Sequence, residues 1–336
     1  MRVAAIILLS VAAGLAVPAR VLAQAEAPVG VRAVGMGGAF TAVADDASAV
    51  FWNPAGLASG SYFSLVVDRN GLNTPDDGAV THGRSGLLVA AASLPLGFSY
   101  YRTRLTTTQP YSATALQAAD RNTLQGEVRL DTLVTDQIGA AVVQSVGRVL
   151  AVGGTLKFIH GTAASGLTLL SGEAARHAAK KLPSAASWKV DGDLGVMAAL
   201  GTVRVGLTVR NVGEPSFETT GGFSPLVLQR QVRGGVGLAI VPGVTLAADF
   251  DITTANAGAG RWRDAAIGGE AKVARGAWIR SGVHWNAAGG EPTGAAPIVS
   301  VGGSYTIHGS IMADAQASLG SKNGDRGWGV GVRLVF

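Results

Sequence analysis

The chain ends in Gly324-Asp-Arg-Gly-Trp-Gly-Val-Gly-Val-Arg-Leu-Val-Phe336, the stretch that decides the fold. Apolar side chains occupy every second position from Trp328 to Phe336, and glycine or arginine fills most positions between them. Because successive side chains of a β-strand point to opposite faces, this strand has one apolar face and one face that meets small or polar groups. The pattern is typical of a barrel strand whose outer face touches hydrocarbon.

Both ends of the chain indicate export. The aromatic last residue, Phe336, resembles the end of the terminal strand of bacterial outer-membrane β-barrels, an assembly signal that the barrel assembly machinery reads. Residues 1–25 have the pattern of a signal peptide, with Arg2 before a short apolar run and cleavage expected after Ala23 or Ala25. That run is shorter than the roughly 20 residues of a spanning helix. We therefore expect a protein of the bacterial outer membrane, in contact with its lipid.

The composition suits such a barrel. Hydrophobic residues make up 48% of the chain and charged residues 15%, yet no long apolar run follows residue 25. A barrel produces this combination because its strands spread apolar residues over alternate positions. The absence of cysteine excludes disulfides, thiolate metal sites and cysteine nucleophiles. The formal net charge of +5, or +3 without Arg2 and Arg20, is spread along the chain, which argues against a nucleic-acid partner.

From about residue 61 onward, the chain consists of segments in which apolar and polar residues alternate. The connections between these segments are short and long by turns. This is how a transmembrane barrel is built, with tight periplasmic turns and longer external loops. The long connections are expected around 70–83, 106–123, 161–186, 213–227, 254–261, 287–295 and 320–325. The segments predict about fourteen strands, near 61–69, 84–93, 96–106, 124–145, 148–160, 187–200, 203–212, 228–240, 243–253, 262–274, 276–286, 296–307, 310–319 and 326–336.

A soluble β-sandwich would also alternate. Its strands are usually about five or six residues long. The segments here are longer, close to the roughly 9–11 residues that a strand needs to cross a bilayer. Together with the export signal, this length favours an all-β fold, a transmembrane antiparallel β-barrel.

Residues 29–60 break the alternation and are rich in small residues. Three glycines suit a tight backbone path, two adjacent acids indicate a helix start, and Asn-Pro-Ala-Gly indicates the turn that ends it. These positions are Gly35, Gly37, Gly38, Asp45, Asp46, Asn53 and Pro54. Such a compact segment suits a piece of chain packed inside a barrel mouth.

A family resemblance covers this segment. Arg32-Ala-Val-Gly-Met-Gly-Gly-Ala-Phe-Thr-Ala-Val-Ala-Asp-Asp-Ala-Ser-Ala-Val-Phe-Trp-Asn-Pro-Ala-Gly-Leu57 closely resembles the amino-terminal signature of PorV/PorQ-like outer-membrane proteins, relatives of the FadL long-chain fatty acid transporters. Shorter pieces also look like that group: Gly154–Lys157, Val209–Gly213, Gln231–Gly235 and Leu246–Asp249. The resemblance implies a fourteen-stranded barrel with a hatch in its lumen. The expected domains are a signal peptide (1–25), a hatch (26–60) and the barrel (61–336).

The resemblance leaves two functions open. FadL-type members pass hydrophobic molecules from an external groove past the hatch, whereas PorV-type members serve protein secretion and surface attachment. Our leading hypothesis is passive transport or binding of hydrophobic, fatty-acid-like small molecules. In it the Asp45–Asp46 pair anchors the hatch to arginines of the lumen. The alternative hypothesis is a barrel scaffold without transport.

Alternation turns both signs of charge into the lumen. One interpretation is a headgroup site in which an arginine holds a carboxylate. The other, which we favour, is a set of ion pairs that let charges survive inside a barrel. The lumen-lining candidates are Arg204, Arg210, Asp249, Asp251, Trp278, Arg280 and His284.

Other side chains offer little chemistry. The five histidines lack metal-ligand spacing, and a pairing such as His284 with Asp249 is no more than any barrel would offer. We expect no metal, no cofactor and no enzymatic activity. Aromatic residues near segment ends are expected to form interfacial girdles, namely Trp52, Trp188, Trp262, Trp285, Trp328, Tyr62, Tyr100 and Tyr101.

Overall fold

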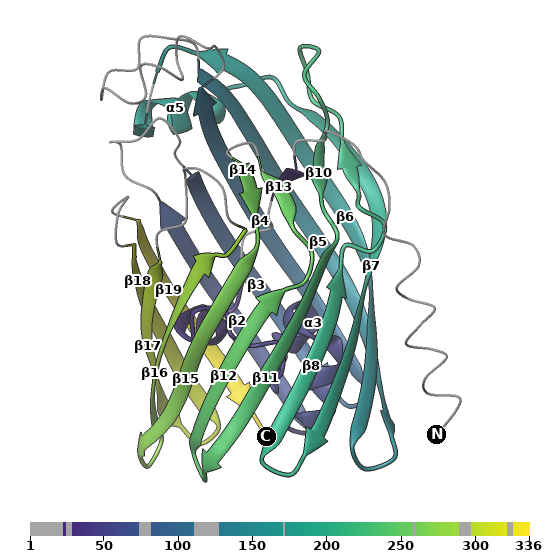
Figure 1. Cartoon of the computed structure of the whole chain (residues 1–336), viewed down its shortest axis with the longest axis vertical. Helices are drawn as coiled ribbons and strands as arrows, with labels where there is room; N and C mark the ends of the chain where they lie inside the picture. Colours follow the sequence, from purple (N-terminus) through teal and green to yellow (C-terminus); the bar gives the residue numbers. More distant parts are fainter. Residues whose placement is uncertain are drawn as a thin grey trace.

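Fourteen antiparallel strands close into a barrel in the computed structural model (Figure 1). The structure describes residues 23–24, 29–73, 82–110, 128–170, 172–257, 260–288, 297–320 and 325–336. The barrel strands are β2 (Phe63–Asn73), β3 (His82–Ser93), β4 (Leu96–Pro110), β5 (Val128–Val146), β6 (Leu150–Thr168), β7 (Ala185–Leu200), β8 (Val203–Arg210), β11 (Gln231–Val241), β12 (Val244–Asp251), β15 (Asp264–Ala274), β16 (Ala277–Asn286), β17 (Ile298–His308), β18 (Ile311–Gly320) and β19 (Arg326–Val335). The predicted fold class and strand number are confirmed.

Short turns join the strands at the end of the barrel where the chain terminates. Five of these turns contain a glycine with a positive φ, which L side chains rarely adopt. These glycines are Gly147, Gly201, Gly243, Gly276 and Gly309. Phe336 lies beside Phe63 at this end, donating to its carbonyl oxygen over 3.0 Å, so the last residue pairs with the start of the first barrel strand.

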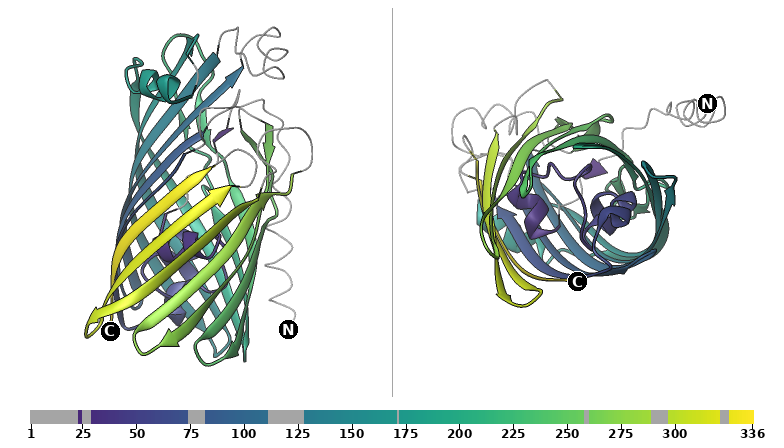
Figure 2. Two further views of the ribbon diagram at one scale, coloured as in Figure 1. Left: turned by 90° about the vertical axis from the view of Figure 1, so that its left-hand side faces the viewer. Right: turned by 90° about the horizontal axis from the view of Figure 1, so that it is seen from below.

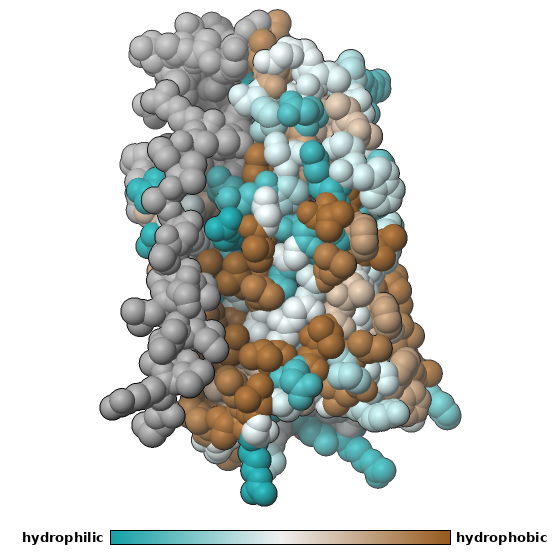
Figure 3. All heavy atoms as spheres, turned by 90° about the vertical axis from the view of Figure 1, so that its right-hand side faces the viewer, coloured by the Kyte–Doolittle hydropathy of each residue, from teal (hydrophilic) through white to brown (hydrophobic). Residues whose placement is uncertain are grey.

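The outer surface of the barrel is apolar. Side chains such as Ile138, Phe158 and Val190 are about half exposed on its outside. In Figure 3, hydrophobic side chains gather over the lower part of the visible face and hydrophilic ones become frequent above. This surface has the apolar band of a barrel that faces lipid. Among the described residues, no helix is both long enough and apolar enough to cross a membrane.

One flank of the barrel stands taller than the other (Figure 2, left). Strands β5 and β6 each have 19 residues, whereas β8 and β12 have 8. The predicted ends at 106 and 160 were therefore too early. Alternation fails there because both faces of the upper strands are covered: Leu133 packs against Phe217 on the lumen side and Leu130 packs against helix α5 (Gly172–Ala179) on the outside.

Short elements complete the upper end. The connection between β8 and β11 contains β9 (Ser216–Phe217) and β10 (Leu226–Leu228), and β10 pairs with β1 (Ala23–Gln24). A hairpin of β13 (Ala255–Ala257) and β14 (Gly260–Trp262) follows β12. Apart from Ala23–Gln24, the predicted signal peptide lies outside the described residues.

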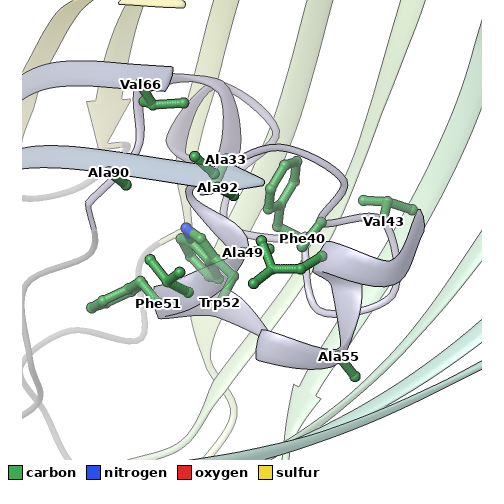
Figure 4. Close-up of a cluster of buried hydrophobic side chains, with 14 of the residues drawn as sticks. Ala33, Phe40, Val43, Ala49, Phe51, Trp52, Ala55, Val66, Ala90 and Ala92 are labelled. Carbon is green, nitrogen blue, oxygen red and sulfur yellow. The ribbon is translucent and has the colours of Figure 1, made fainter. Parts of the chain in front are cut away.

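Residues 29–60, here called the luminal segment, lie inside the barrel (Figure 2, right). The segment contains α2 (Val31–Gly35), α3 (Ala49–Trp52) and the 3₁₀ helix η2 (Pro54–Ser59). Its apolar side chains form one buried cluster with the inner faces of β2 to β7 (Figure 4). Phe51 is central in this cluster, with ring centroids 5.5 Å from Trp52 and 5.4 Å from Tyr101. The first barrel strand begins shortly after the segment, at Phe63.

Candidate functional site

Three pairs of wall glycines receive the luminal segment. In each pair the two residues lie opposite each other on neighbouring strands, as Gly153–Gly195, Gly206–Gly235 and Gly268–Gly282. A Cβ atom at Gly153 would lie 2.5 Å from the carbonyl carbon of Pro54, and one at Gly268 would lie 2.1 Å from the carbonyl oxygen of Met36. A larger residue would collide with the segment at five of these six places, and at Gly235 first with the Asp249 carboxylate, so only glycine fits there.

Carboxylates of the wall bind the backbone of the segment. Asp249 on β12 accepts hydrogen bonds from the N–H groups of Phe40 and Thr41, at 3.0 and 2.9 Å. Asp68 on β2 accepts one from the N–H of Val31 at 2.8 Å. These acceptors satisfy backbone donors that would otherwise be buried without a partner.

Arg32 links the segment to the wall through an ion network. Its guanidinium contacts Asp45, lies 3.0 Å from Asp46 and lies 2.8 Å from Glu270 on β15. Asp46 also lies 3.3 Å from Arg333 on β19. The anchoring in the structure therefore differs in one respect from the expectation that both Asp45 and Asp46 bind arginines of the lumen. Asp46 reaches an arginine of the lumen, whereas Asp45 pairs with an arginine of the segment itself.

The charge of Asp46 is strongly stabilised. Burial alone would raise the pKa of this carboxyl group, but Arg32 and Arg333 outweigh the burial and lower the pKa to about 2. The network continues through Arg280, which lies 3.0 Å from Glu270 and 3.1 Å from Asp314. Arg280, a predicted lumen-lining residue, thus holds neighbouring carboxylates.

The predicted hatch residues shape the segment as follows. Gly35 ends α2, and Gly37 and Gly38 follow with φ angles of 67° and 82°. Asn53 accepts a hydrogen bond from the backbone of η2 at 3.1 Å and donates one to the backbone of β7 at 3.2 Å. Pro54 then occupies the first position of η2, where a missing N–H costs no hydrogen bond.

A pocket opens above the luminal segment, on the side of the long connections. The space between its walls is about 850 Å³, a volume that includes part of the open solvent at its mouth. The segment forms its floor, and the upper ends of β8, β11, β12, β15 and β16 contribute to its wall. Its lining includes Val34, Gly37, Gly38, Trp52, Arg84, Arg210, Arg233, Asp251, Trp262, Asp264 and His284.

The charges in this pocket are unequally paired. Arg233 lies 2.6 Å from Asp251 and 2.9 Å from Asp264, so both carboxylates are engaged. Arg84 on β3 has no carboxylate within 4 Å among the described residues. Its guanidinium lies 5.3 Å from the ring centroid of Trp262. The guanidinium of Arg84 beside the Trp262 ring therefore suits an anionic or amphiphilic ligand.

The predicted lumen residues separate into three groups. Arg210, Asp251 and His284 line the pocket, whereas Asp249 and Arg280 bind the segment or its ion network. Arg204 and Trp278 are half-buried near the short turns that precede β8 and β16, at the end of the barrel away from the pocket. In the described part of the chain, no group of three His, Asp or Glu side chains is arranged to hold a metal ion.

Sequence reasoning missed several pocket residues. Arg84 begins a predicted strand but was not among the lumen candidates. It lies four residues before Leu88, which is buried, so the alternation places both side chains on the inner face. The girdle assignment was wrong for Trp52 and Tyr101, which are 2% and 1% exposed beside Phe51. It was also wrong for Trp262, which lines the pocket. Position near a segment end does not distinguish a lipid-facing ring from a lumen-facing one.

Known structures share this architecture. A toluene transporter of Pseudomonas putida, TodX, superposes with a TM-score of 0.59 at 15% identity, over 94% of this chain and 98% of that one. The toluene transporter TbuX of Ralstonia pickettii gives 0.59 and 15% over 92% and 98%. A FadL homologue of Pseudomonas aeruginosa gives 0.59 and 10% over 93% and 100%. The fold is that of the FadL-type barrels. No family model and no curated protein matches the sequence.

The FadL-type fold accounts for the strand number and the full length of the chain, since nearly all of both chains superpose. The fold does not by itself identify a ligand. The residues that line the pocket therefore decide which ligands it can bind.

Proposed function

We propose that this chain is an outer-membrane channel for the passive passage of hydrophobic small molecules, with the luminal segment as its hatch. The observation that carries the proposal is the pocket directly above the segment, inside a closed barrel with an apolar exterior. A ligand in this pocket would rest on Trp52 and Gly38, so the segment is the element that it must pass. The similar solved structures are described as toluene transporters and a FadL homologue, which supports the same class of function.

The pocket favours an amphiphile over a plain hydrocarbon. Trp52 and Trp262 offer apolar surface, and Arg84 offers a guanidinium that has no carboxylate within 4 Å among the described residues. A fatty-acid-like molecule matches both features, since its carboxylate can take two parallel hydrogen bonds from a guanidinium. We therefore propose a hydrophobic acid as the substrate class, captured at Arg84.

Passage requires the segment to move. It is fixed to the wall at the glycine pairs, by Asp249 and by Arg32, so its displacement breaks a defined set of contacts. The comparisons give no support to the expected PorV/PorQ relation, but the scaffold role that it implied would keep the segment fixed. Transport and scaffold therefore differ in whether the segment has to shift.

A reversible crosslink tests this difference. A Cβ atom at Gly237 would lie 3.7 Å from the Cβ of Ala42, close to the spacing of a disulfide. Since the chain has no cysteine, Ala42→Cys/Gly237→Cys creates a single possible disulfide. In proteoliposomes we expect uptake of a labelled long-chain fatty acid to stop on oxidation and return on reduction. Gly237→Cys alone is the control, because a Cβ atom there would also lie 2.5 Å from Cγ1 of Val43.

Two outcomes would contradict the proposal. Uptake by the wild-type protein no faster than in empty liposomes would reject transport and favour the scaffold. Equal uptake by the oxidised and reduced double variant would show that the segment is not a hatch.

A further inference from the structure

Three arginines form a basic surface on the outside of the barrel. The register places Arg69 on β2 opposite Leu87 on β3, and Leu87 opposite Arg102 on β4. Arg104 lies two residues further along the same face of β4, opposite Ser85. Alternation turns all of these side chains outward, away from buried neighbours such as Asp68 and Tyr101 on the inner face. We call Arg69, Arg102 and Arg104 the outer arginine cluster.

The cluster lies just above the apolar band. The next row of outward residues toward the short turns runs across six strands as Val67, Val89, Tyr100, Ile138, Phe158 and Val190. Its five aliphatic and phenylalanine side chains are 37% to 62% exposed. Hydrocarbon-facing surface therefore ends one residue pair below the arginines.

Exposed aromatic residues flank the cluster on both sides along its register rows. The row of Arg102 continues through β5 and β6 to Trp188 on β7, which is 66% exposed. The row of Arg104 continues the other way to Trp328 on β19, which is 47% exposed. Because exposed tryptophans concentrate at the boundary between hydrocarbon and headgroups, the cluster lies at the depth of lipid headgroups.

The cluster carries excess positive charge. Arg102 lies 3.3 Å from Asp136, which also accepts a hydrogen bond from Tyr100 at 2.6 Å. Arg69 and Arg104 have no carboxylate within 4 Å in the described part of the chain. At headgroup depth an arginine side chain can reach water and the anionic groups of lipids. In the described part of the chain, two of the three guanidinium groups have no protein carboxylate to hold them back from such an anion.

Helix α5 extends the basic surface upward. It packs outside β4 to β6, and the side chain of Arg176 lies over Gly83, where an added Cβ would be 3.1 Å from its Cδ. Gly83 is two residues from Ser85 on the outer face of β3, so α5 borders the cluster. Lys180 and Lys181 follow the helix and are exposed.

We infer that the outer arginine cluster binds the phosphate groups of a lipopolysaccharide-type lipid of the outer leaflet. Guanidinium groups bind phosphate through paired hydrogen bonds, and clustered basic residues at headgroup depth select anionic lipids. The acyl chains of the lipid would then lie on the apolar row below. This inference rests on the outer-membrane location proposed above but not on transport.

Paired charge variants test the inference. Arg69→Gln/Arg104→Gln removes the two uncompensated charges, and Arg148→Gln/Arg275→Gln removes two exposed arginines from turns at the opposite rim. Binding of bisphosphorylated lipid A to the detergent-purified full chain would be measured by native mass spectrometry. We expect a loss of about ten-fold or more in affinity for the first variant and little change for the second. Arg69→Lys/Arg104→Lys keeps the charge but loses the paired hydrogen bonds, so its affinity should lie between those of the wild type and of the glutamine variant.

Lipids and anions of other kinds separate the possible sources of phosphate. Dephosphorylated lipid A and inorganic phosphate should each bind much more weakly than lipid A. Equal losses in the two glutamine variants, or no loss in the first, would overturn the inference. So would inorganic phosphate binding as tightly as lipid A, since the site would then take a free anion. Fatty acid uptake in vesicles free of lipopolysaccharide should be the same for all variants, which keeps this test separate from that of the channel.

Discussion

Gly153 on β6 and Gly195 on β7 face each other across the two strands, and residues 53–55 of the luminal segment occupy the space that their side chains would fill. The same relationship recurs at two other pairs in the wall. The chain has 48 glycines, and this contact explains why some of them stand in the middle of strands, where glycine is otherwise unfavourable.

Neighbouring glycines on opposite faces of β6 test this contact. Gly153→Val should displace the luminal segment and lower the free energy of unfolding by about 1–3 kcal/mol, as overpacking does. Gly154→Val should have little effect, because its nearest contact is 3.6 Å away on the outer face. Urea unfolding of the lipid-embedded protein measures both. Equal destabilisation would mean that strand geometry, and not the segment, requires glycine.

Removal of the Asp249 carboxylate should loosen the segment near Phe40. Asp249→Ala leaves two buried N–H groups without their acceptor, at a cost of roughly 1–3 kcal/mol for each. Amide hydrogen exchange at Phe40 and Thr41 should therefore accelerate, while exchange within β5 stays the same. Unchanged protection at these two amides would contradict the role assigned to Asp249.

The Asp46 network should depend on pH only in acid. A folded pKa of about 2 lies below the usual value of about 3.9, so the ionised carboxylate stabilises the fold fully above pH ~4 and this stabilisation is lost as the pH falls toward 2. The difference in unfolding free energy between wild type and Asp46→Asn should be about 2 kcal/mol at neutral pH and should shrink near pH 2. A difference that already shrinks between pH 7 and 5 would contradict the lowered pKa.

Charge selectivity should follow Arg84. Arg84→Gln should weaken binding of a long-chain fatty acid about ten-fold or more, since a charge-assisted hydrogen bond is lost. Binding of the matching fatty alcohol should change little. Arg204→Gln, in the lumen but outside the pocket, is the control, and fluorescence titration in detergent measures all three proteins. A parallel loss for acid and alcohol would show that Arg84 acts on the shape of the pocket and not on the charge.

Most of each strand was predictable because its residues alternate with a period of two, and because most short turns carry a glycine that the turn geometry requires. Glycines such as Gly201 and Gly243 indicate the turns in the sequence, and both have a positive φ in the structure. The inward direction of Asp249 and Arg280 followed from the same period. The period of two predicts which face of a strand a side chain lies on, but it does not predict which residues that side chain contacts.

The partners of those residues were not predictable. Asp249 could equally have faced a water-filled lumen, and only the folded chain shows that Phe40 and Thr41 lie against it. The extra length of β5 and β6 was hidden because α5 and Phe217 bury opposite faces there. Trp52 was wrongly assigned to the interfacial girdle because tryptophans of the lumen and of the lipid boundary both occur near segment ends in the sequence.

The unequal strand lengths have a consequence for how the mouth is approached. At about 3.4 Å per residue, β5 is roughly 65 Å long and β8 roughly 27 Å, so the rim slopes steeply from one side to the other. A large particle arriving from water would contact the high side first. Small molecules have their shortest way in over the low side, where β8, β11 and β12 end beside the pocket.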